Sequence, residues 1–288
     1  MNIYVKNSII TLIALLFCLS PIFQVFGRQS IQLGLTWGVP PEEEIVDGQI
    51  AGMINIWSIM AGYNTNNFFG EMTTVVNIYS AAWGLGESNS IAFYVGHGHS
   101  DYMFNWIFWE QQWYICDNSG NKAYDKNIYS FWSGTDRNVD FAFLWACEQG
   151  DTKGGTHWSG TPYGMATAWL HGTPSSDDGY AQPDGGGKIW IGIKGAAFGL
   201  SDNLILGYMV GYRFLYAFYF AALCDGATYS IKAALDFAAF CVWGSPSYSD
   251  CSLYKGYWWT EWQQGRLVNM TGQMVTYGDG NMHISSLT

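Results

Sequence analysis

The sequence has few charged residues and very few cations. Only 12% of its 288 residues are charged, and 12 Lys and Arg against 23 Asp and Glu give a formal net charge of −11. Because nucleic acids are bound through concentrated positive charge, this balance excludes a nucleic-acid-binding protein. The combination of low charge with 49% hydrophobic residues also excludes an intrinsically disordered chain.

Internal repeats and low-complexity linkers are also missing, so we expect a single domain over residues 28–288. Residues 28–70 are either part of this domain or an N-terminal extension. Residues 1–27 carry one early cation, Lys6, an apolar run and a helix-breaking Pro21, which is typical of a secretory signal peptide. An uncleaved N-terminal anchor is the alternative. The protein is therefore predicted to be secreted or displayed at the cell surface.

A second apolar stretch, Leu204–Leu223, is long enough to cross a membrane. It carries Arg213 in its middle, and an arginine at the bilayer centre costs ~2.5–3.5 kcal/mol. We therefore expect a buried helix here and no membrane span once the signal peptide is removed.

Cysteine is scarce, and removal of residues 1–27 leaves five. An odd number in an exported protein predicts two disulfides and one remaining thiol. Cys241 and Cys251 are close enough in sequence to close a small loop, and Cys116 with Cys224 forms the other candidate pair. Cys147 is then left over.

Continuous apolar runs alternate with helical patterns along the chain. Ser90–Gly96, Val139–Ala146 and Lys188–Ile193 are typical of buried parallel strands, and Ile31–Trp37 of a shorter one. Helical patterns cover Pro41 to about Gly62, Glu71–Trp83, Tyr163–His171, Asn203–Leu223 and Tyr229–Val242. This alternation predicts an α/β fold, with a mostly parallel sheet and helices on both of its faces.

Two of the predicted strands end in reactive residues. His97-Gly98 follows the first, and Cys147 follows the second. Ligand crevices of open α/β sheets lie outside the carboxyl ends of the strands, so we expect these residues to face each other there. A thiol beside a proton acceptor is a good nucleophile, and a histidine can pass its proton to a leaving amine. Cys147 and His97 are thus the predicted catalytic pair, with the Gly98 and Cys147 amides as the predicted oxyanion hole.

The segments FYVGHGHSD and LWACEQGD resemble the histidine and cysteine motifs of caspase-like cysteine peptidases, especially those of gingipain and legumain type. The resemblance implies a caspase-like three-layer sandwich and hydrolysis of a peptide or protein substrate, with His97 and Cys147 in the catalytic roles. It implies no metal or organic cofactor. Glu148 matches the acid that borders the specificity pocket of legumain, and Asp151 is expected beside it. An acidic pocket would favour a basic residue before the cleaved bond.

A zinc hydrolase is the main alternative. His97, His99 and Asp101 fit a His-x-His-x-Asp motif, which can bind zinc from one loop. Later histidines available as further ligands are His157, His171 and His283. Tyr102 stands where that motif has another histidine, and the alternative gives Cys147 no role. A third hypothesis is a catalytically inactive surface or assembly protein on the same fold.

Aromatic residues are abundant, with 15 Trp and 19 Tyr. Trp106, Trp109 and Trp113 are spaced by three and then four residues, which predicts a buried helix face. The cluster Trp258, Trp259 and Trp262 is interpreted in the same way. So many aromatic residues also leave room for a contact surface with a second copy of the chain.

Overall fold

The structure is a computed structural model, which describes nine stretches of the chain. They are residues 28–87, 89–105, 108–131, 139–150, 164–170, 187–202, 209–224, 229–263 and 266–286. The predicted signal peptide, residues 1–27, lies outside the described residues, and so do Asp151, His157 and His171.

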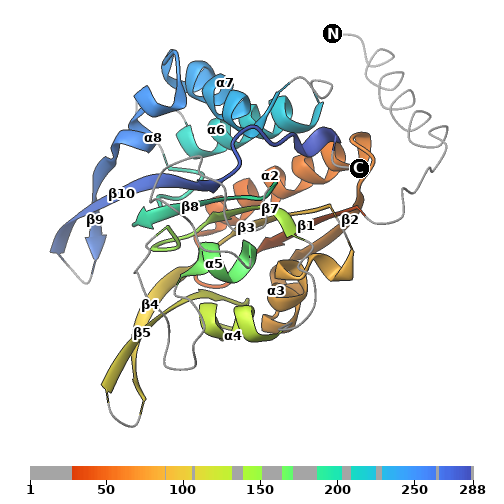
Figure 1. Cartoon of the computed structure of the whole chain (residues 1–288). Helices are drawn as coiled ribbons and strands as arrows, with labels where there is room; N and C mark the ends of the chain where they lie inside the picture. The colour runs from red at the N-terminus through yellow and green to blue at the C-terminus, as the bar shows by residue number, and fades with distance from the viewer. Residues whose placement is uncertain are drawn as a thin grey trace, which may run out of the picture.

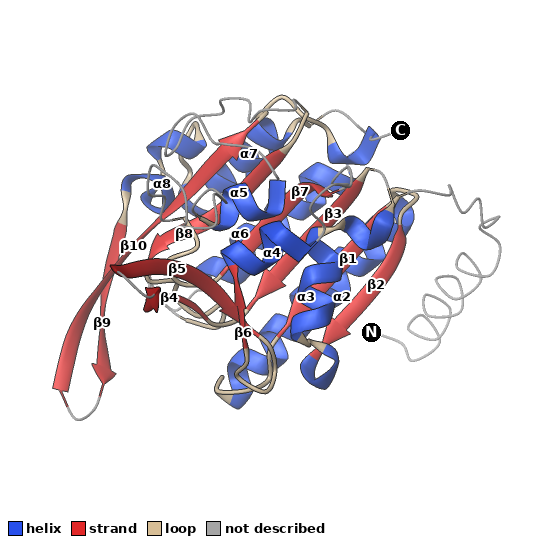
Figure 2. Ribbon diagram, turned by 60° about the horizontal axis from the view of Figure 1, so that its bottom comes forward, coloured by secondary structure: helices blue, strands red, loops and turns tan. Residues whose placement is uncertain are grey.

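The described strands form one large sheet of seven and one small sheet of three. In spatial order the large sheet contains β2 (Asn64–Phe69), β1 (Gln29–Gly34), β3 (Ser90–Val95), β7 (Val139–Trp145), β8 (Ile189–Gly195), β10 (Arg266–Gly278) and β9 (Tyr257–Gln263). Neighbours from β2 to β8 run parallel, whereas β10 and β9 are antiparallel additions at one edge. The predicted mostly parallel sheet is confirmed (Figure 2).

The central strands are apolar on both faces because both faces are covered. Phe93 of β3 and Phe143 of β7 belong to one hydrophobic cluster, and their chain neighbours Tyr94 and Leu144 belong to the other. Successive side chains of a strand point to opposite faces, so continuous apolar runs supply two cores at once. This is why these runs show no alternation in the sequence.

Helices cover the two faces of the large sheet (Figure 1). One layer contains α2 (Pro41–Met60), α6 (Val210–Tyr219) and α7 (Ile231–Trp243), and the other contains α3 (Val75–Ala82), α4 (Asp125–Phe131) and α5 (Met165–Leu170). A π-helical turn, Phe220–Cys224, continues α6, and α8 (Ser252–Lys255) precedes β9. Short 3₁₀ turns are η1 (Gly70–Met72), η2 (Gly84–Gly86), η4 (Tyr248–Asp250) and η5 (Ile284–Ser286). The predicted three-layer α/β sandwich is confirmed.

Residues 28–70 are built into the large sheet. They supply β1, α2 and β2, and β1 lies between β2 and β3. The helix α2 begins as its sequence indicates, with Pro41 as its first residue and three glutamates in its first turn.

The small sheet consists of β4 (Gly98–Asn105), β5 (Phe108–Cys116) and β6 (Lys122–Tyr124), all antiparallel. The β4–β5 hairpin projects from the body of the molecule (Figure 1). Trp109 and Trp113 lie on β5, and Trp258 and Trp259 lie on β9, so the helix predictions for both tryptophan clusters are wrong. Trp113 is buried at the base of its hairpin while Trp109 is exposed toward the tip, so the tryptophan spacing does not reflect one helical face.

The apolar stretch that begins at Leu204 contains α6 and the π-helical turn, which are largely buried under the sheet, while residues 203–208 lie outside the described residues. In the part of the chain that the structure describes, no helix has both the length and the apolar character needed to cross a membrane.

All five cysteines of the described residues are thiols, so the predicted pairings Cys241–Cys251 and Cys116–Cys224 are wrong. Cys116 belongs to the core on one face of the large sheet, whereas Cys224 packs against the core on the opposite face. Cys241 is exposed on α7, while Cys251 is buried. A disulfide needs the two Cα atoms within about 7 Å. Burial raises the pKa of Cys116 to about 11, which keeps its thiol protonated.

Candidate active site

The strands β3 and β7 bring His97 and Cys147 to the same edge of the sheet. They are neighbours in parallel register, with Val95 opposite Trp145. His97 and Cys147 are each the second residue after this last pair, so their positions in the two loops correspond. Neighbouring strands lie about 4.8 Å apart, and the predicted adjacency of the two motifs is therefore present in the backbone.

His97 and Cys147 line one cleft of about 900 Å³. Its other walls come from the loop after β1 and the start of α2, the loop after β8, and the start of β9. The cleft lies outside the carboxyl ends of the parallel strands, where α/β folds place their ligands.

The thiol of Cys147 faces the backbone that follows β8. The N–H of Ala197 donates a hydrogen bond to Cys147 Sγ over 3.2 Å, and the thiol donates a longer one, 3.9 Å, to Ala197 O. A thiolate is a stronger acceptor than a thiol, so the shorter contact, from the Ala197 N–H, stabilises the nucleophilic form of the side chain.

The turn that carries Cys147 is held to β8 by main-chain hydrogen bonds. The Glu148 N–H donates to Gly195 O (2.6 Å), and the Gly150 N–H donates to Ile193 O (2.7 Å). Glu148 has a φ of 60°, a conformation that is strained for a residue with a side chain. A Cβ at Gly150 would lie 2.8 Å from Lys194 N, so only glycine lets the cysteine turn come this close to the backbone of β8. The backbone that directly follows Cys147 is thus fixed to β8.

The histidine loop is anchored by Tyr94 and by β5. The Tyr94 hydroxyl donates to His97 O and to Cys116 O, each over 2.9 Å, and the Cys116 N–H also donates to His97 O over 3.0 Å. Burial holds the pKa of Tyr94 well above its usual value, so its hydroxyl keeps the proton that it donates. The imidazole lies edge-on to the Trp37 ring, with centroids 5.8 Å apart. The loop after β1 therefore flanks the imidazole.

Gly98 brings the two motifs into direct contact. A Cβ added there would lie 2.9 Å from Cys147 O and would overlap the side-chain amide of Gln149. Hydrogen-bonded and open pairs alternate along an antiparallel ladder. Because the Cys116 N–H bonds His97 O, the next pair, Gly98 with Ile115, is an open one. The Gly98 N–H therefore points away from β5.

Gln149 is a site residue that the sequence analysis missed. It is fully buried, and its side-chain amide donates to Cys147 O (2.6 Å) and to Tyr114 O (3.1 Å) of β5. One side chain thus links the cysteine turn to the β4–β5 hairpin. No motif or spacing in the sequence distinguishes this glutamine from an exposed one.

Glu148 was predicted to bind substrate, but its carboxylate is directed at the hairpin. It accepts hydrogen bonds from His99 Nδ1 (2.6 Å) and Ser100 Oγ (2.7 Å), and it is not among the residues that line the cleft. The position of Asp151 lies outside the described residues.

His99 and Asp101, two of the three residues of the predicted zinc motif, form contacts with different partners. His99 pairs with Glu148, while Asp101 binds Lys122 (2.6 Å) and the Tyr124 hydroxyl (3.0 Å). Burial alone would raise the pKa of Asp101, but these hydrogen bonds lower it below its usual value. In the described stretches, no three His, Cys, Asp or Glu side chains form a group that could hold a metal ion.

The described acidic residues that line the cleft are Glu43 and Asp47 of α2 and Asp202 of the loop after β8, and none of them belongs to the cysteine motif. Glu43 and Asp47, one helical turn apart, both line the cleft and are buried. The Glu43 carboxylate accepts hydrogen bonds from Leu200 N, Ser201 N and Ser201 Oγ. Burial, together with the neighbouring Glu43, raises the pKa of Asp47 to about 9, so this carboxyl is neutral near pH 7. The predicted preference for a basic residue stays a prediction.

Comparisons with known proteins give only distant similarity. No protein-family model matches the chain, and no curated protein matches it. Among solved structures, the Drosophila initiator caspase Dronc is similar, with 9% sequence identity, a TM-score of 0.45, and coverage of 90% of this chain and 83% of that one. Caspase-1 from Spodoptera frugiperda is also similar, with 11% identity, a TM-score of 0.42, and coverage of 76% and 77%. Similarity at this level transfers no residue role, so the site is assigned from the geometry of this chain.

Proposed function

We propose that the protein is a cysteine endopeptidase with Cys147 as nucleophile and His97 as general base and acid. The observation that carries the proposal is the contact at Gly98, where the histidine loop packs against the carbonyl of Cys147 itself. Thiol catalysis requires a base within reach of the thiol, and the proposal is supported by two reactive side chains that stand on touching loops and line one cleft.

The proposed chemistry is acyl transfer in two steps. His97 takes the thiol proton while Cys147 Sγ attacks the peptide carbonyl carbon, and the same proton then passes to the departing amine. The thioester that remains is hydrolysed by water, with His97 again accepting a proton, and the thiol is restored. The Gly98 N–H points away from β5, so it is available with the Cys147 N–H to stabilise the oxyanion.

The motifs support the same assignment. The segments around His97 and Cys147 resemble those of gingipain- and legumain-type peptidases, and the cleft is large enough for several residues of an extended peptide. We also propose that the protein is exported, as residues 1–27 indicate. N-terminal sequencing of protein recovered from the medium tests this, and a chain that retains Met1 inside the cell would contradict it.

Alkylation of the thiols tests the catalytic assignment. With limiting iodoacetamide at pH 6.5, Cys147 should be labelled faster than the exposed Cys241, as measured by peptide mass spectrometry, because the Ala197 N–H stabilises its thiolate. His97→Ala should slow labelling of Cys147 and leave Cys241 unchanged.

Peptide hydrolysis is the second test of the catalytic role of Cys147. Cys147→Ala should abolish the cleavage of a mixed peptide library, while the control variant Cys241→Ser keeps full activity. Full activity in Cys147→Ala would overturn the proposal. A folded wild-type protein that cleaves nothing, with Cys147 no more reactive than Cys241, would overturn it as well.

A further inference from the structure

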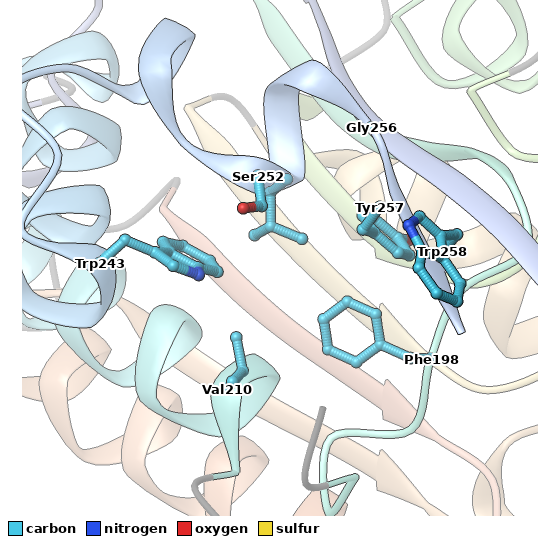
Figure 3. Close-up of a pocket in the computed structure, with 8 residues that line it drawn as sticks. Phe198, Val210, Trp243, Ser252, Gly256, Tyr257 and Trp258 are labelled. Atoms are coloured by element: carbon cyan, nitrogen blue, oxygen red, sulfur yellow. The ribbon is translucent and has the colours of Figure 1, made fainter. Parts of the chain in front are cut away.

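A second cavity of about 210 Å³ lies beside the catalytic cleft (Figure 3). Val210 of α6 and Leu253 of α8 are buried residues that line it, and the ring of Trp243, at the end of α7, lies beside Val210 and points into the same space. Phe198 and Trp258 close the side toward the cleft, while Ser252 lies at the surface. The cavity is thus built from three helices, the loop after β8 and the start of β9.

The cavity adjoins the cleft. Phe198 and Trp258 line both spaces, so these two side chains form the wall that the cavity and the cleft share. Phe198 directly follows Ala197, whose N–H contacts Cys147 Sγ. An extended chain advances about 3.3–3.6 Å per residue, so a peptide bound in the cleft would reach the cavity within a few residues of the bond that Cys147 attacks.

The chemistry of the cavity favours a large apolar side chain. None of its lining residues is charged, and the hydroxyl of Tyr257 is already used as a donor to Ala196 O over 3.0 Å. Burial of an unpaired charge or polar group there would cost free energy. A cavity of about 150 Å³ with apolar walls is enough to hold a benzene ring, so the volume here accommodates an aromatic side chain.

The walls are aromatic rings held by their own contacts. Phe198 packs edge-on against Tyr257, with centroids 4.9 Å apart, and Tyr257 stacks on Trp259 at 5.6 Å. Rings fixed in this way lose little freedom on binding and offer both faces and edges to a further ring. By contrast, the neighbouring cleft contains the carboxyl groups of Glu43 and Asp47.

From its volume, its uncharged lining and its aromatic walls we propose that the cavity is a specificity pocket that binds an aromatic or other large apolar side chain of the peptide substrate, while the buried indole N–H of Trp243 and the Ser252 hydroxyl are the polar side-chain groups of its wall besides Tyr257 and Trp258. This inference rests on the proposed function and adds a substrate class to it. It also assigns a function to Trp243 and Trp258, which the catalytic pair leaves unexplained.

The test uses internally quenched octapeptides in which one phenylalanine replaces alanine at each position in turn around a cleaved bond. Burial of a phenylalanine side chain should raise kcat/KM roughly 10- to 100-fold at one position. Ser252→Phe, at an exposed position on the cavity wall, should fill the space and reduce this preference to below about threefold. The control Lys255→Phe changes an exposed residue of the same helix outside the cavity and should retain the preference.

The outcomes separate the two proposals. Cleavage without preference for phenylalanine at any position, or a preference that survives Ser252→Phe, would overturn the specificity pocket and leave the peptidase assignment intact. If the wild type cleaves no peptide, the peptidase assignment fails, and calorimetric titration of the Cys147→Ala protein with the same peptides still tests the pocket. Equal affinity for the phenylalanine and alanine peptides would then overturn it, whereas tighter binding that Ser252→Phe removes would support it.

Discussion

The two walls of the cleft are held in place by different means. The cysteine turn, residues 147–150, is fixed by main-chain hydrogen bonds to β8 and by glycines packed against backbone. Another wall, the loop 199–202, is held largely by side-chain carboxylates: Glu43 accepts from Leu200 and Ser201, and Asp202 accepts from Gly199 N. The first wall therefore depends on backbone geometry and tolerates almost no change at its glycines. The second depends on side chains, so it can vary while the nucleophile stays in position.

The largest effect is expected from Gly98→Ala, which disturbs the cysteine turn, residues 147–150. We call this turn the main-chain wall, because main-chain hydrogen bonds hold it. The new methyl group would lie 2.9 Å from Cys147 O, so the histidine loop and the cysteine turn must separate. A displacement of about 1 Å at a catalytic group can cost roughly 100-fold in rate, and overpacking costs roughly 1–3 kcal/mol of stability. Peptide hydrolysis and urea denaturation measure both effects.

Gly52→Ala is the matched control, because nothing lies within 4 Å of a Cβ at this position in α2. It should keep full activity and gain roughly 0.5–1 kcal/mol of stability. Equal activity of the two variants would show that the contact at Gly98 does not set the catalytic geometry.

Much of the main-chain wall could be predicted from the sequence. The apolar runs that end at Val95 and Trp145 indicate adjacent buried strands, and the rule for parallel sheets places the residues that follow them at one edge. The positions of His97 and Cys147 could therefore be predicted from local sequence patterns alone. Gln149 could not be found in this way, because its contact with Tyr114 depends on where the β4–β5 hairpin lies.

The rest of the cleft depends on contacts between distant segments. The glutamates at the start of α2 indicate a helix start, but nothing local shows that Glu43 accepts hydrogen bonds from Leu200 and Ser201. The helix predictions for the tryptophans of β5 and β9 failed because these tryptophans do not share one face: in β9, Trp258 is exposed, whereas its neighbour Trp259 packs against the core. The cysteine pairing failed for a similar reason, since sequence distance does not show that the large sheet separates Cys116 from Cys224.

Glu43→Ala removes a carboxylate that holds the other wall of the cleft, the loop 199–202. It leaves the N–H groups of Leu200 and Ser201 without their acceptor, at a cost of roughly 1–3 kcal/mol for each buried group. The loop 199–202 should loosen while the cysteine turn stays in place, so KM should rise several-fold with a smaller change in kcat. Glu44→Ala, at the exposed neighbouring position, is the control and should change neither. A loss confined to kcat would mean that the two walls are not independent.

Gln149→Leu should have a smaller effect, because main-chain hydrogen bonds still hold the cysteine turn. The variant keeps the side-chain volume but loses the hydrogen bonds to Cys147 O and Tyr114 O. We expect a loss of roughly 1–2 kcal/mol in stability and a fall in kcat of only a few-fold, measured by denaturation and steady-state kinetics. Gln111→Leu, on the half-buried face of β5, is the control. A loss in kcat as large as that of Gly98→Ala would show that the side chain, rather than the main chain, holds this wall.

The smallest effect on activity near pH 7 is expected from Asp47→Asn, because this buried carboxyl is already neutral there, whereas its effect on stability depends on pH. The folded protein keeps the Asp47 proton up to about pH 9, because burial and the nearby Glu43 raise its pKa, whereas the unfolded chain loses this proton above its ordinary pKa of 3.8. Between these values the folded state binds more protons, so this group makes wild-type stability fall as the pH rises. The asparagine does not titrate, so the variant should gain stability relative to the wild type from pH 5 to pH 9, as measured by urea denaturation at both values. A difference that stays constant over this range would show that the Asp47 carboxyl is ionised in the folded protein.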